Sequence, residues 1–323
     1  MNDAHGRTIE YLRVSITDRC NLRCVYCMPA CGSKSIPAGQ VLSDDEILRL
    51  CGILAELGIR RVKVTGGEPL ARKNAVELIR ALKTTPGIEQ VTLTSNGVLL
   101  GEHLDELSRV GLDAVNISLD AIDPEAFYNI TRCRCGELEK ILAAIGRATS
   151  LGIPVKVNCV PIRTLNDLQL VKVAALAQDK NIAVRFIELM PMGCSGGFEP
   201  IPNEEVIKRL QAAYGPLKPF SGKLGNGPAV YYTAEGFKGK LGFISALSHE
   251  FCHNCNRLRL TSDGALKPCL NSDARLDLKT MLRSGVPDAE IAQAVRVFVD
   301  KKPLRHEFEK ASGELLAMHN VGG

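Results

Sequence analysis

Two groups of cysteines are the residues in this chain most suited to chemistry. Cys20, Cys24 and Cys27 stand near the start of the sequence, and Cys252, Cys255 and Cys269 stand near its end. Closely spaced thiolates bind zinc or an iron–sulfur cluster. A structural zinc ion takes four ligands, and a 4Fe–4S cluster has four irons to anchor. Three cysteines therefore leave one position open, where a substrate can bind.

A closed zinc site is the alternative for both groups. Cys31 would complete a four-thiolate site with the first group, and His249 or His253 would complete one with the second. A non-catalytic zinc protein that binds a partner has the same spacings. The cysteine spacing by itself leaves both interpretations open.

Composition narrows the class of protein. The chain has 323 residues, a net charge of +4 and no tryptophan, so we expect no nucleic-acid partner. No apolar run approaches the roughly 18 residues of a membrane span, and the first residues contain no apolar signal region. We therefore expect a cytoplasmic protein without membrane contact, in which 12 cysteines indicate metal or redox chemistry more than disulfides.

Strand-like and helix-like segments alternate from residue 10 to residue 190. Six units of this kind predict a parallel sheet. A capping box begins the first helix at Ser43, and Gly58 ends it. Other helices are expected at 73–83, 124–151 and 166–180. The predicted strands are 12–17, 61–65, 90–94, 114–119, 155–160 and 184–189.

These strands alternate between apolar and polar residues. Lys63, Asn116, Ser118, Lys156 and Asn158 each stand between apolar neighbours. Strands covered by helices on both faces are almost continuously apolar, so one face of this sheet must line a wet cavity. Solvated edge strands would show the same alternation, but several strands of one sheet cannot all be edges. The pattern predicts an α/β fold, a curled and partly open βα barrel with a ligand in its lumen.

The sequence changes character after residue 215. Prolines and glycines over 216–228 predict a flexible stretch. Strands are expected at 230–233 and 241–244, and a hairpin at 257–267, before helices at 274–284 and 288–300. We therefore expect two domains, a barrel over 5–215 and an α+β domain over 216–323.

The residues around the first cysteine group carry a resemblance. Cys20-x3-Cys24-x2-Cys27, with Tyr26 before the last cysteine, resembles the signature of the radical S-adenosylmethionine superfamily. Thr65-Gly-Gly-Glu-Pro69 after the second strand resembles the superfamily's segment beside the methionine amino group. The resemblance implies an incomplete (β/α)6 barrel, closed here by the C-terminal α+β domain.

The second cysteine group narrows the resemblance. Cys252-x2-Cys255-Asn-Arg-Leu-Arg259, with Cys269 and the terminal Val321-Gly-Gly323, resembles the GTP 3′,8-cyclase family. The similarity runs from about residue 9 to the end of the chain. It implies conversion of GTP to 3′,8-cyclo-7,8-dihydro-GTP, the first step of molybdenum cofactor biosynthesis.

The resemblance also implies cofactors and partners. The cofactors would be two 4Fe–4S clusters and S-adenosylmethionine. The partners would be GTP, a flavodoxin- or ferredoxin-type electron donor, cyclic pyranopterin monophosphate synthase downstream and a second copy in a homodimer. The implied site residues fall into four sets: the cluster ligands Cys20, Cys24, Cys27, Cys252, Cys255 and Cys269; the S-adenosylmethionine contacts Tyr26, Gly67, Ser118 and Met190; the GTP contacts Arg13, Lys63, Thr94, Lys156, Arg257 and Arg259; and the catalytic residues Arg257, Arg259, Gly322 and Gly323.

The residues give independent support for an anion site. Arg13, Lys63 and Lys156 are each flanked by apolar residues of the opposite strand face. Three cations facing one lumen repel one another unless an anion joins them, and a triphosphate supplies one. The alternative is that each cation pairs with a core carboxylate such as Glu188.

Some residues depart from the family pattern. Lys63 stands where the family usually has arginine, so it keeps the charge and loses the bidentate fork. Cys31, Cys133 and Cys135 are not family ligands, and the loop over 191–202 is short. A peptide-modifying radical enzyme is the other activity within the same chemistry, but the two arginines and the Gly-Gly terminus argue against it.

Overall fold

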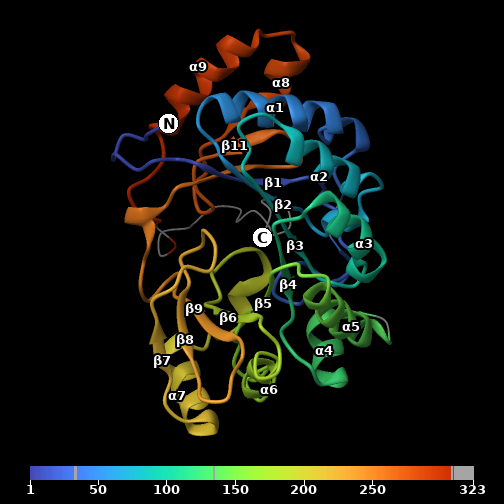
Figure 1. Ribbon diagram of the computed structural model, residues 1–323. Coiled ribbons are helices and arrows are strands. Elements are labelled where there is room, and N and C mark those ends of the chain that lie inside the picture. Colours follow the sequence, from blue (N-terminus) through green and yellow to red (C-terminus); the bar gives the residue numbers. More distant parts are fainter. Residues whose placement is uncertain (33–34, 134, 307, 309–323) are drawn as a thin grey trace.

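The computed structural model describes residues 1–32, 35–133, 135–306 and 308. Over this part of the chain the strands form one sheet, in the order β12-β11-β10-β1-β2-β3-β4-β5-β6-β9-β8-β7. Figure 1 shows the sheet curling around the centre of the molecule. Neighbouring strands from β1 to β6 are parallel, as predicted. They are β1 (Tyr11–Ser15), β2 (Arg61–Thr65), β3 (Gln90–Ser95), β4 (Ala114–Ser118), β5 (Val155–Cys159) and β6 (Ala183–Ile187).

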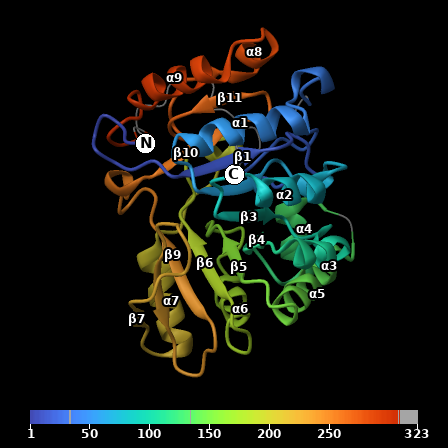
Figure 2. The same ribbon diagram turned by 45° about the horizontal axis from the view of Figure 1, so that its top comes forward.

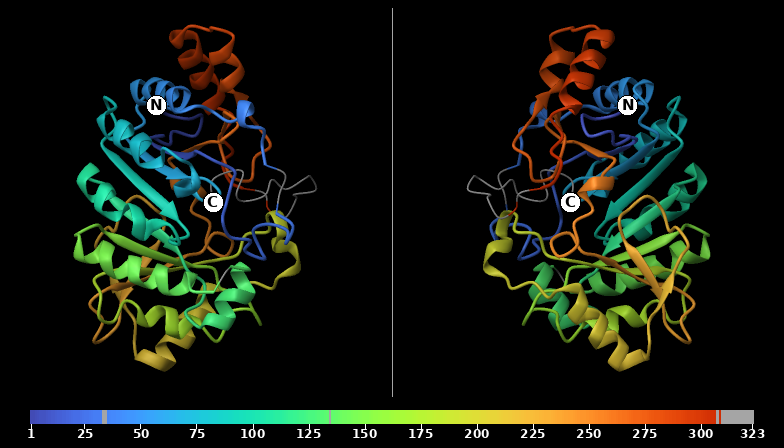
Figure 3. Two further views of the ribbon diagram at one scale, coloured as in Figure 1. Left: turned by 90° about the vertical axis from the view of Figure 1, so that its right-hand side faces the viewer. Right: turned by 90° about the vertical axis from the view of Figure 1, so that its left-hand side faces the viewer.

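Helices follow the parallel strands and cover the outer face of the sheet, as Figure 3 shows from the side. Most of these helices pack on a neighbouring helix along this face. They are α1 (Asp44–Glu56), α2 (Ala75–Thr84), α3 (Leu100–Val110), α4 (Pro124–Thr131), α5 (Glu137–Ser150), α6 (Leu170–Ala175) and α7 (Asn203–Tyr214). The predicted capping box of α1 is present, because Ser43 and Glu46 exchange side-chain and backbone hydrogen bonds. Gly58 follows with a φ of 102°, a conformation that favours glycine.

The strands after residue 215 extend the barrel sheet at both of its ends. On one side β7 (Lys218–Phe220) and β8 (Val230–Thr233) join β9 (Lys240–Ile244), which pairs in parallel with β6. On the other side β10 (Arg257–Leu260) pairs in parallel with β1 and continues into β11 (Ala265–Lys267) and β12 (Leu276–Asp277). Figure 2 shows α8 (Leu278–Arg283) and α9 (Asp288–Val299) lying beside α1. The result is an incomplete barrel that does not close through hydrogen bonds, which confirms the predicted fold class.

Side chains alternate across the sheet as the sequence predicted. Val62, Val64, Val91 and Leu93 belong to the apolar core under the helices. Polar neighbours on the same strands, among them Lys63, line the lumen. A cavity lined partly by polar side chains therefore lies inside the curl of the sheet.

Several predicted boundaries were wrong. The helix expected over 124–151 is two helices, because Arg132 ends α4 in the left-handed region and Gly136 also has positive φ. Only Leu170–Ala175 is α-helical within 166–180. The stretch predicted to be flexible contains β7 and a segment that lines the lumen. In the described part of the chain, no helix has the length and apolar character needed to cross a bilayer.

Candidate functional site

One cavity of about 360 Å³ occupies the lumen of the curled sheet. Every described residue to which the sequence gave a role lines it. Gly322 and Gly323 lie outside the described residues. The lining residues with predicted roles are Arg13, Cys20, Cys24, Tyr26, Cys27, Lys63, Gly67, Thr94, Ser118, Lys156, Met190, Cys252, Cys255, Arg257, Arg259 and Cys269. Both cysteine groups and the predicted cations therefore line one cavity. More than 200 residues separate the two cysteine groups in sequence.

The loop that contains the first cysteine group rests on the two glycines after β2. The amide of Gly67 donates to the carbonyl of Thr17 over 2.8 Å, and the amide of Glu68 donates to that of Arg19 over 2.7 Å. A Cβ atom at Gly67 would lie 2.3 Å from the oxygen of Arg19. Only glycine permits this approach, so the glycine pair fixes where the cysteine loop begins.

Glu68 connects the same loop to β3. Its side chain is fully buried and accepts hydrogen bonds from the amide of Asn96 and the hydroxyl of Ser95. Burial raises the pKa of Glu68 to about 7, against the effect of these hydrogen bonds. The side chain of Asn96 in turn donates to Sγ of Cys20 over 3.8 Å. Glu68 therefore helps to hold a group that contacts the first cysteine.

The spacing of the thiols argues against a closed zinc site. Four sulfurs around one zinc ion lie about 3.8 Å apart, given Zn–S bonds of about 2.3 Å. Among the described residues, three ligand atoms come within 4.8 Å of one another only at Glu250, Cys252 and His306. Neither cysteine group does so, and Cys31, His249 and His253 are exposed. Two sets of three thiols around an open cavity fit clusters larger than one ion.

The second cysteine group is assembled by a hairpin and the turn before it. Cys252 begins the 3-10 turn Cys252–Asn254, Cys255 precedes β10, and Cys269 follows β11. Burial alone would raise the pKa of Cys255, but Arg257 and Lys302 outweigh it and lower this pKa to about 6. A thiolate favoured by neighbouring cations is a ready metal ligand.

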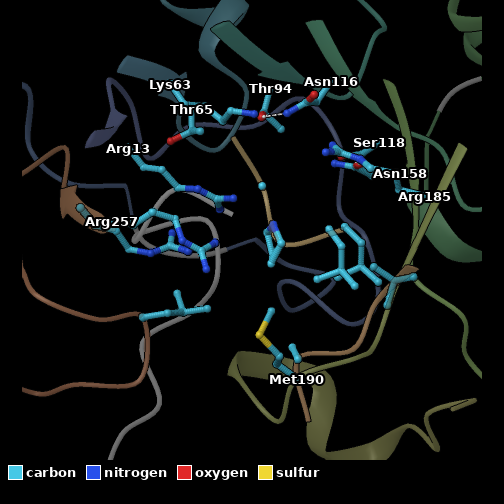
Figure 4. A pocket seen from close by; sticks show the side chains of 18 of the residues that line it. Arg13, Lys63, Thr65, Thr94, Asn116, Ser118, Asn158, Arg185, Met190 and Arg257 are labelled. Atoms are coloured by element: carbon cyan, nitrogen blue, oxygen red, sulfur yellow. Dashed lines mark hydrogen bonds between the residues drawn. The ribbon is translucent and has the colours of Figure 1, made fainter. Parts of the chain in front are cut away.

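Three of the predicted cations form a row across adjacent strands. Arg259 on β10 is in register with Arg13 on β1, which is in register with Lys63 on β2. Burial, followed by the charges of neighbouring cations, lowers the pKa of Lys63 and of Arg259 well below their usual values. Figure 4 shows Arg13, Lys63 and Arg257 on one side of the cavity. A polyanion would relieve this repulsion, so the row is a candidate phosphate site.

Glu188 is not the carboxylate partner that the alternative interpretation required. It accepts hydrogen bonds from the amides of Leu247 and Ser248 and from the hydroxyl of Ser248. Within the described part of the chain, no ion pair joins Lys63 or Lys156 to a carboxylate. No described carboxylate therefore neutralises these two lysines, and an anionic ligand would favour their charged forms.

The opposite wall contains a cation that the sequence analysis missed. Arg185 on β6 donates to Oδ1 of Asn158 over 2.9 Å and 2.5 Å, and Figure 4 places both residues across the cavity from Arg13. Lys156 donates to the carbonyl of Leu224 over 2.7 Å, and burial and Arg185 lower the pKa of Lys156 to about 8. Arg185 stands between Val184 and Phe186, both in the core. The alternation that identified Lys156 therefore contained the signal for Arg185.

Tyr26, Ser118 and Met190 line the same cavity as the first cysteine group. Tyr26 donates a hydrogen bond of 2.6 Å to Asp120, and burial, then Asp120, raises the pKa of Tyr26 well above its usual value. Ser118 ends β4 and Met190 follows β6. Parallel strands present their carboxyl ends at one edge, where barrel enzymes place their active sites. On the neighbouring strands, Asn116 donates to Thr94 over 3.3 Å (Figure 4).

Solved structures support the fold. The chain superposes on SuiB from Streptococcus suis bound to S-adenosylmethionine with a TM-score of 0.61, covering 93% of this chain and 76% of that one. The sequences share 13% identity, so this likeness shows the fold alone. A further SuiB structure, also with a TM-score of 0.61, is 14% identical.

Sequence comparisons identify the family. Residues 14–177 match the radical SAM superfamily, and residues 182–308 match Molybdenum Cofactor Synthesis C. The GTP 3′,8-cyclase of Desulforamulus reducens is 43% identical over the full length of both chains, and so is that of Moorella thermoacetica. The GTP 3′,8-cyclase of Heliobacterium modesticaldum is 46% identical over 95% of this chain and 94% of its own. With this similarity, its fold and its two cysteine groups, the chain belongs to the GTP 3′,8-cyclase family of the radical S-adenosylmethionine superfamily.

Proposed function

We propose that this chain is the enzyme that converts GTP to 3′,8-cyclo-7,8-dihydro-GTP in the first step of molybdenum cofactor biosynthesis. The observation that carries the proposal is the single cavity in which both cysteine groups face the row of cations. Full-length relatives with 43% identity bear this enzyme name. A peptide-modifying activity has no comparable support, because the peptide-binding SuiB shares only 14% identity.

The cofactors follow from the family and from the donor atoms. Membership of the superfamily implies a 4Fe–4S cluster and S-adenosylmethionine, and Cys20, Cys24 and Cys27 would hold that cluster. We assign the second cysteine group to a second 4Fe–4S cluster. When bound, these groups would supply radical chemistry for hydrogen abstraction from GTP, and the second cluster would offer an open coordination position.

The residues of the chain would bind and orient both small molecules. Tyr26, Gly67, Ser118 and Met190 would line the S-adenosylmethionine site beside the first cysteine group. Their place in the cavity supports this assignment. Tyr26 is held by Asp120, so its ring is fixed before the ligand arrives. A fixed ring supports catalysis because the reacting atoms must be held close together and aligned.

The cations would bind GTP. Arg13, Lys63 and Arg259 would contact the triphosphate, since their register places three positive charges side by side. Arg257, whose guanidinium carbon lies 5.0 Å from the ring centre of Phe251, would reach the nucleotide beside the second cysteine group. Thr94 and Lys156 would contact GTP from β3 and β5. Lys63 and Arg259 are buried, which would strengthen their charge-assisted contacts with the ligand.

Other parts of the proposal rest on family membership. We propose that 5–215 contains the radical-generating half and 216–323 the half that holds the second cluster. A flavodoxin- or ferredoxin-type protein would supply electrons, and cyclic pyranopterin monophosphate synthase would consume the product. A cytoplasmic homodimer is the form we expect.

The test combines metal content with product formation. Protein reconstituted without oxygen should contain about eight irons with matching sulfide per chain. With S-adenosylmethionine, a reductant and GTP, it should form the cyclic nucleotide, identified by mass spectrometry. The variant Cys27→Ala should form none, and Cys269→Ala should keep about four irons and lose the product. Four irons with one zinc per chain would contradict the second cluster. Cleavage of S-adenosylmethionine without any cyclic nucleotide product would contradict the proposed GTP cyclisation.

A further inference from the structure

Buried cations from the two ends of the described chain hold the backbone around the second cysteine group. Asp3 and Arg7 precede β1, and Lys302 follows α9. All three side chains are buried, and none of the roles predicted from the sequence includes them. We call Asp3, Arg7 and Lys302 the terminal clasp.

Asp3 fixes the direction of the Arg7 side chain. Oδ2 of Asp3 accepts a hydrogen bond of 2.6 Å from Nε of Arg7. Oδ1 of Asp3 accepts from the amides of His5 and Arg7, over 3.0 Å and 2.9 Å. The side chain of Asp3 is 0% exposed and that of Arg7 is 6% exposed. One carboxylate therefore folds the turn and also neutralises the buried guanidinium, which leaves the terminal nitrogens of Arg7 directed away from Asp3.

Those terminal nitrogens tie the second cysteine group to the segment after α9. Nη1 of Arg7 donates to the carbonyl of Cys252 over 2.8 Å and to that of Leu304 over 3.2 Å. Nη2 donates to the carbonyls of Pro303 and Lys302 over 2.8 Å and 3.3 Å. A planar guanidinium can serve four carbonyls in this way, whereas a lysine ammonium has three donors on a flexible stem.

Lys302 donates to backbone carbonyls close to the other two cysteines. Its Nζ donates to the carbonyl of Pro268 over 2.6 Å and to that of Arg257 over 2.8 Å. Pro268 comes directly before Cys269, and Arg257 comes two residues after Cys255. The backbone within two residues of each cysteine of the second group therefore accepts a hydrogen bond from the clasp.

These contacts matter because local structure does little to hold the cysteines. Cys252 lies in a single 3-10 turn, and Cys255 and Cys269 lie just outside the strands of the hairpin. A cluster needs its sulfur ligands at set distances, and groups that orient ligands change metal affinity by about 10–100-fold. We propose that Asp3, Arg7 and Lys302 are positioning residues that hold Cys252, Cys255 and Cys269 at the spacing required by the second cluster. This inference rests on the proposed function, which assigns a cluster to that group.

The experiment isolates each cysteine group. In the background Cys20→Ala/Cys24→Ala/Cys27→Ala only the second group remains, and anaerobic reconstitution with iron and sulfide should give about four irons per chain. Adding Arg7→Ala should remove most of this iron. In the background Cys252→Ala/Cys255→Ala/Cys269→Ala, the same change should leave the iron of the first group unchanged.

A second measurement needs neither iron nor activity. In metal-free protein, Arg7→Ala should speed alkylation of Cys252 relative to Cys20 on the order of tenfold, the value of one charge-assisted hydrogen bond. Arg7→Lys keeps the charge beside Asp3 and should give a smaller change in the same direction, which preserves the test if Arg7→Ala does not fold. Arg283→Ala is the control, because Arg283 donates to Glu46, Gly39 and Val41, none of which belongs to or adjoins the second cysteine group. It should change neither measurement.

The outcomes separate the two hypotheses. If the background with only the second group binds no iron, the proposed second cluster fails, and alkylation alone decides the role of the clasp. If that background binds iron and the Arg7 variants keep it, with unchanged alkylation of Cys252, the clasp is not a positioning device. Loss of iron from both groups in equal measure would show that Arg7 supports only the overall fold, which also overturns the inference.

Discussion

Cys31 is the residue that would turn the first cysteine group into a closed four-thiolate site. It is exposed, and its thiol donates to the carbonyl of Gly32 over 3.4 Å. We predict that Cys31→Ala keeps iron binding and cleavage of S-adenosylmethionine, because three ligands and an open iron suffice. Cys27→Ala should abolish both. Absorbance of the reconstituted protein and the yield of 5′-deoxyadenosine measure the two properties, and loss of the cluster in Cys31→Ala would overturn the mechanism.

Lys156 allows nucleotide binding to be separated from radical generation. Lys156→Ala should weaken GTP binding by about 1.5–3 kcal/mol, the value of a hydrogen bond to a charged group. Cleavage of S-adenosylmethionine without GTP should survive. Since the pKa of Lys156 is about 8, wild-type affinity should fall as the pH rises above that value, and the variant should lose this dependence. Calorimetric titration with GTP measures the affinity and its pH dependence. Lys140→Ala is the control, because Lys140 is exposed. Unchanged affinity in a folded variant would leave Lys156 a structural role only.

Glu68 gives a prediction about stability and pH. Because its pKa rises from 4.5 to about 7 in the folded chain, the folded state keeps a proton that the unfolded state releases between these values. The unfolding free energy should therefore fall as the pH rises through this window, by about 3 kcal/mol in total. Glu68→Gln should lack this component, whereas exposed Glu125→Gln should retain it. Urea unfolding of metal-free protein at several pH values gives the unfolding free energy of each variant. The same pH dependence in wild type and Glu68→Gln would refute the raised pKa of Glu68.

At the scale of elements, the turn after β2 and the cysteine loop form one unit. The Cβ atom of Gly67→Ala would meet the carbonyl of Arg19, so the cysteine loop must move. We expect this variant to lose about half of the reconstituted iron, since the second group is untouched. Gly101→Ala is the control, because a Cβ atom there meets nothing within 4 Å. Full iron content in Gly67→Ala would show that the loop tolerates displacement.

At the scale of the whole molecule, segments near both ends of the described chain reach the cavity. His306 and Phe308 line it together with residues of β1. The family resemblance places Gly322 and Gly323 beside GTP, a prediction that stays untested because they lie outside the described residues. Deleting both should leave the clusters and GTP binding intact and reduce cyclisation, since orientation and not affinity is lost. Product formation in a single turnover without oxygen measures the rate of cyclisation. A yield equal to that of wild type would show that Gly322 and Gly323 have no role in cyclisation.

Local patterns in the sequence determined the strands, the lumen face and the cysteine groups. The alternation around Lys63 and Lys156 specifies which side of a strand each residue occupies, because successive side chains point to opposite faces. The spacing of Cys20, Cys24 and Cys27 needs only one loop. The same alternation also contained Arg185, which the sequence analysis overlooked.

Only the tertiary structure decided which residues are neighbours across segments. Arg259 lies beside Arg13 because β10 pairs with β1. Arg7 donates to the carbonyl of Cys252, 245 residues away in sequence, because the same pairing brings the segment before β10 close to the segment before β1. The order and register of strands depend on long-range pairing, which no short window of sequence encodes. The sequence by itself therefore determined the chemistry of each residue and the face it occupies. The fold decided that the cations form one row and that both ends of the described chain brace the second cysteine group.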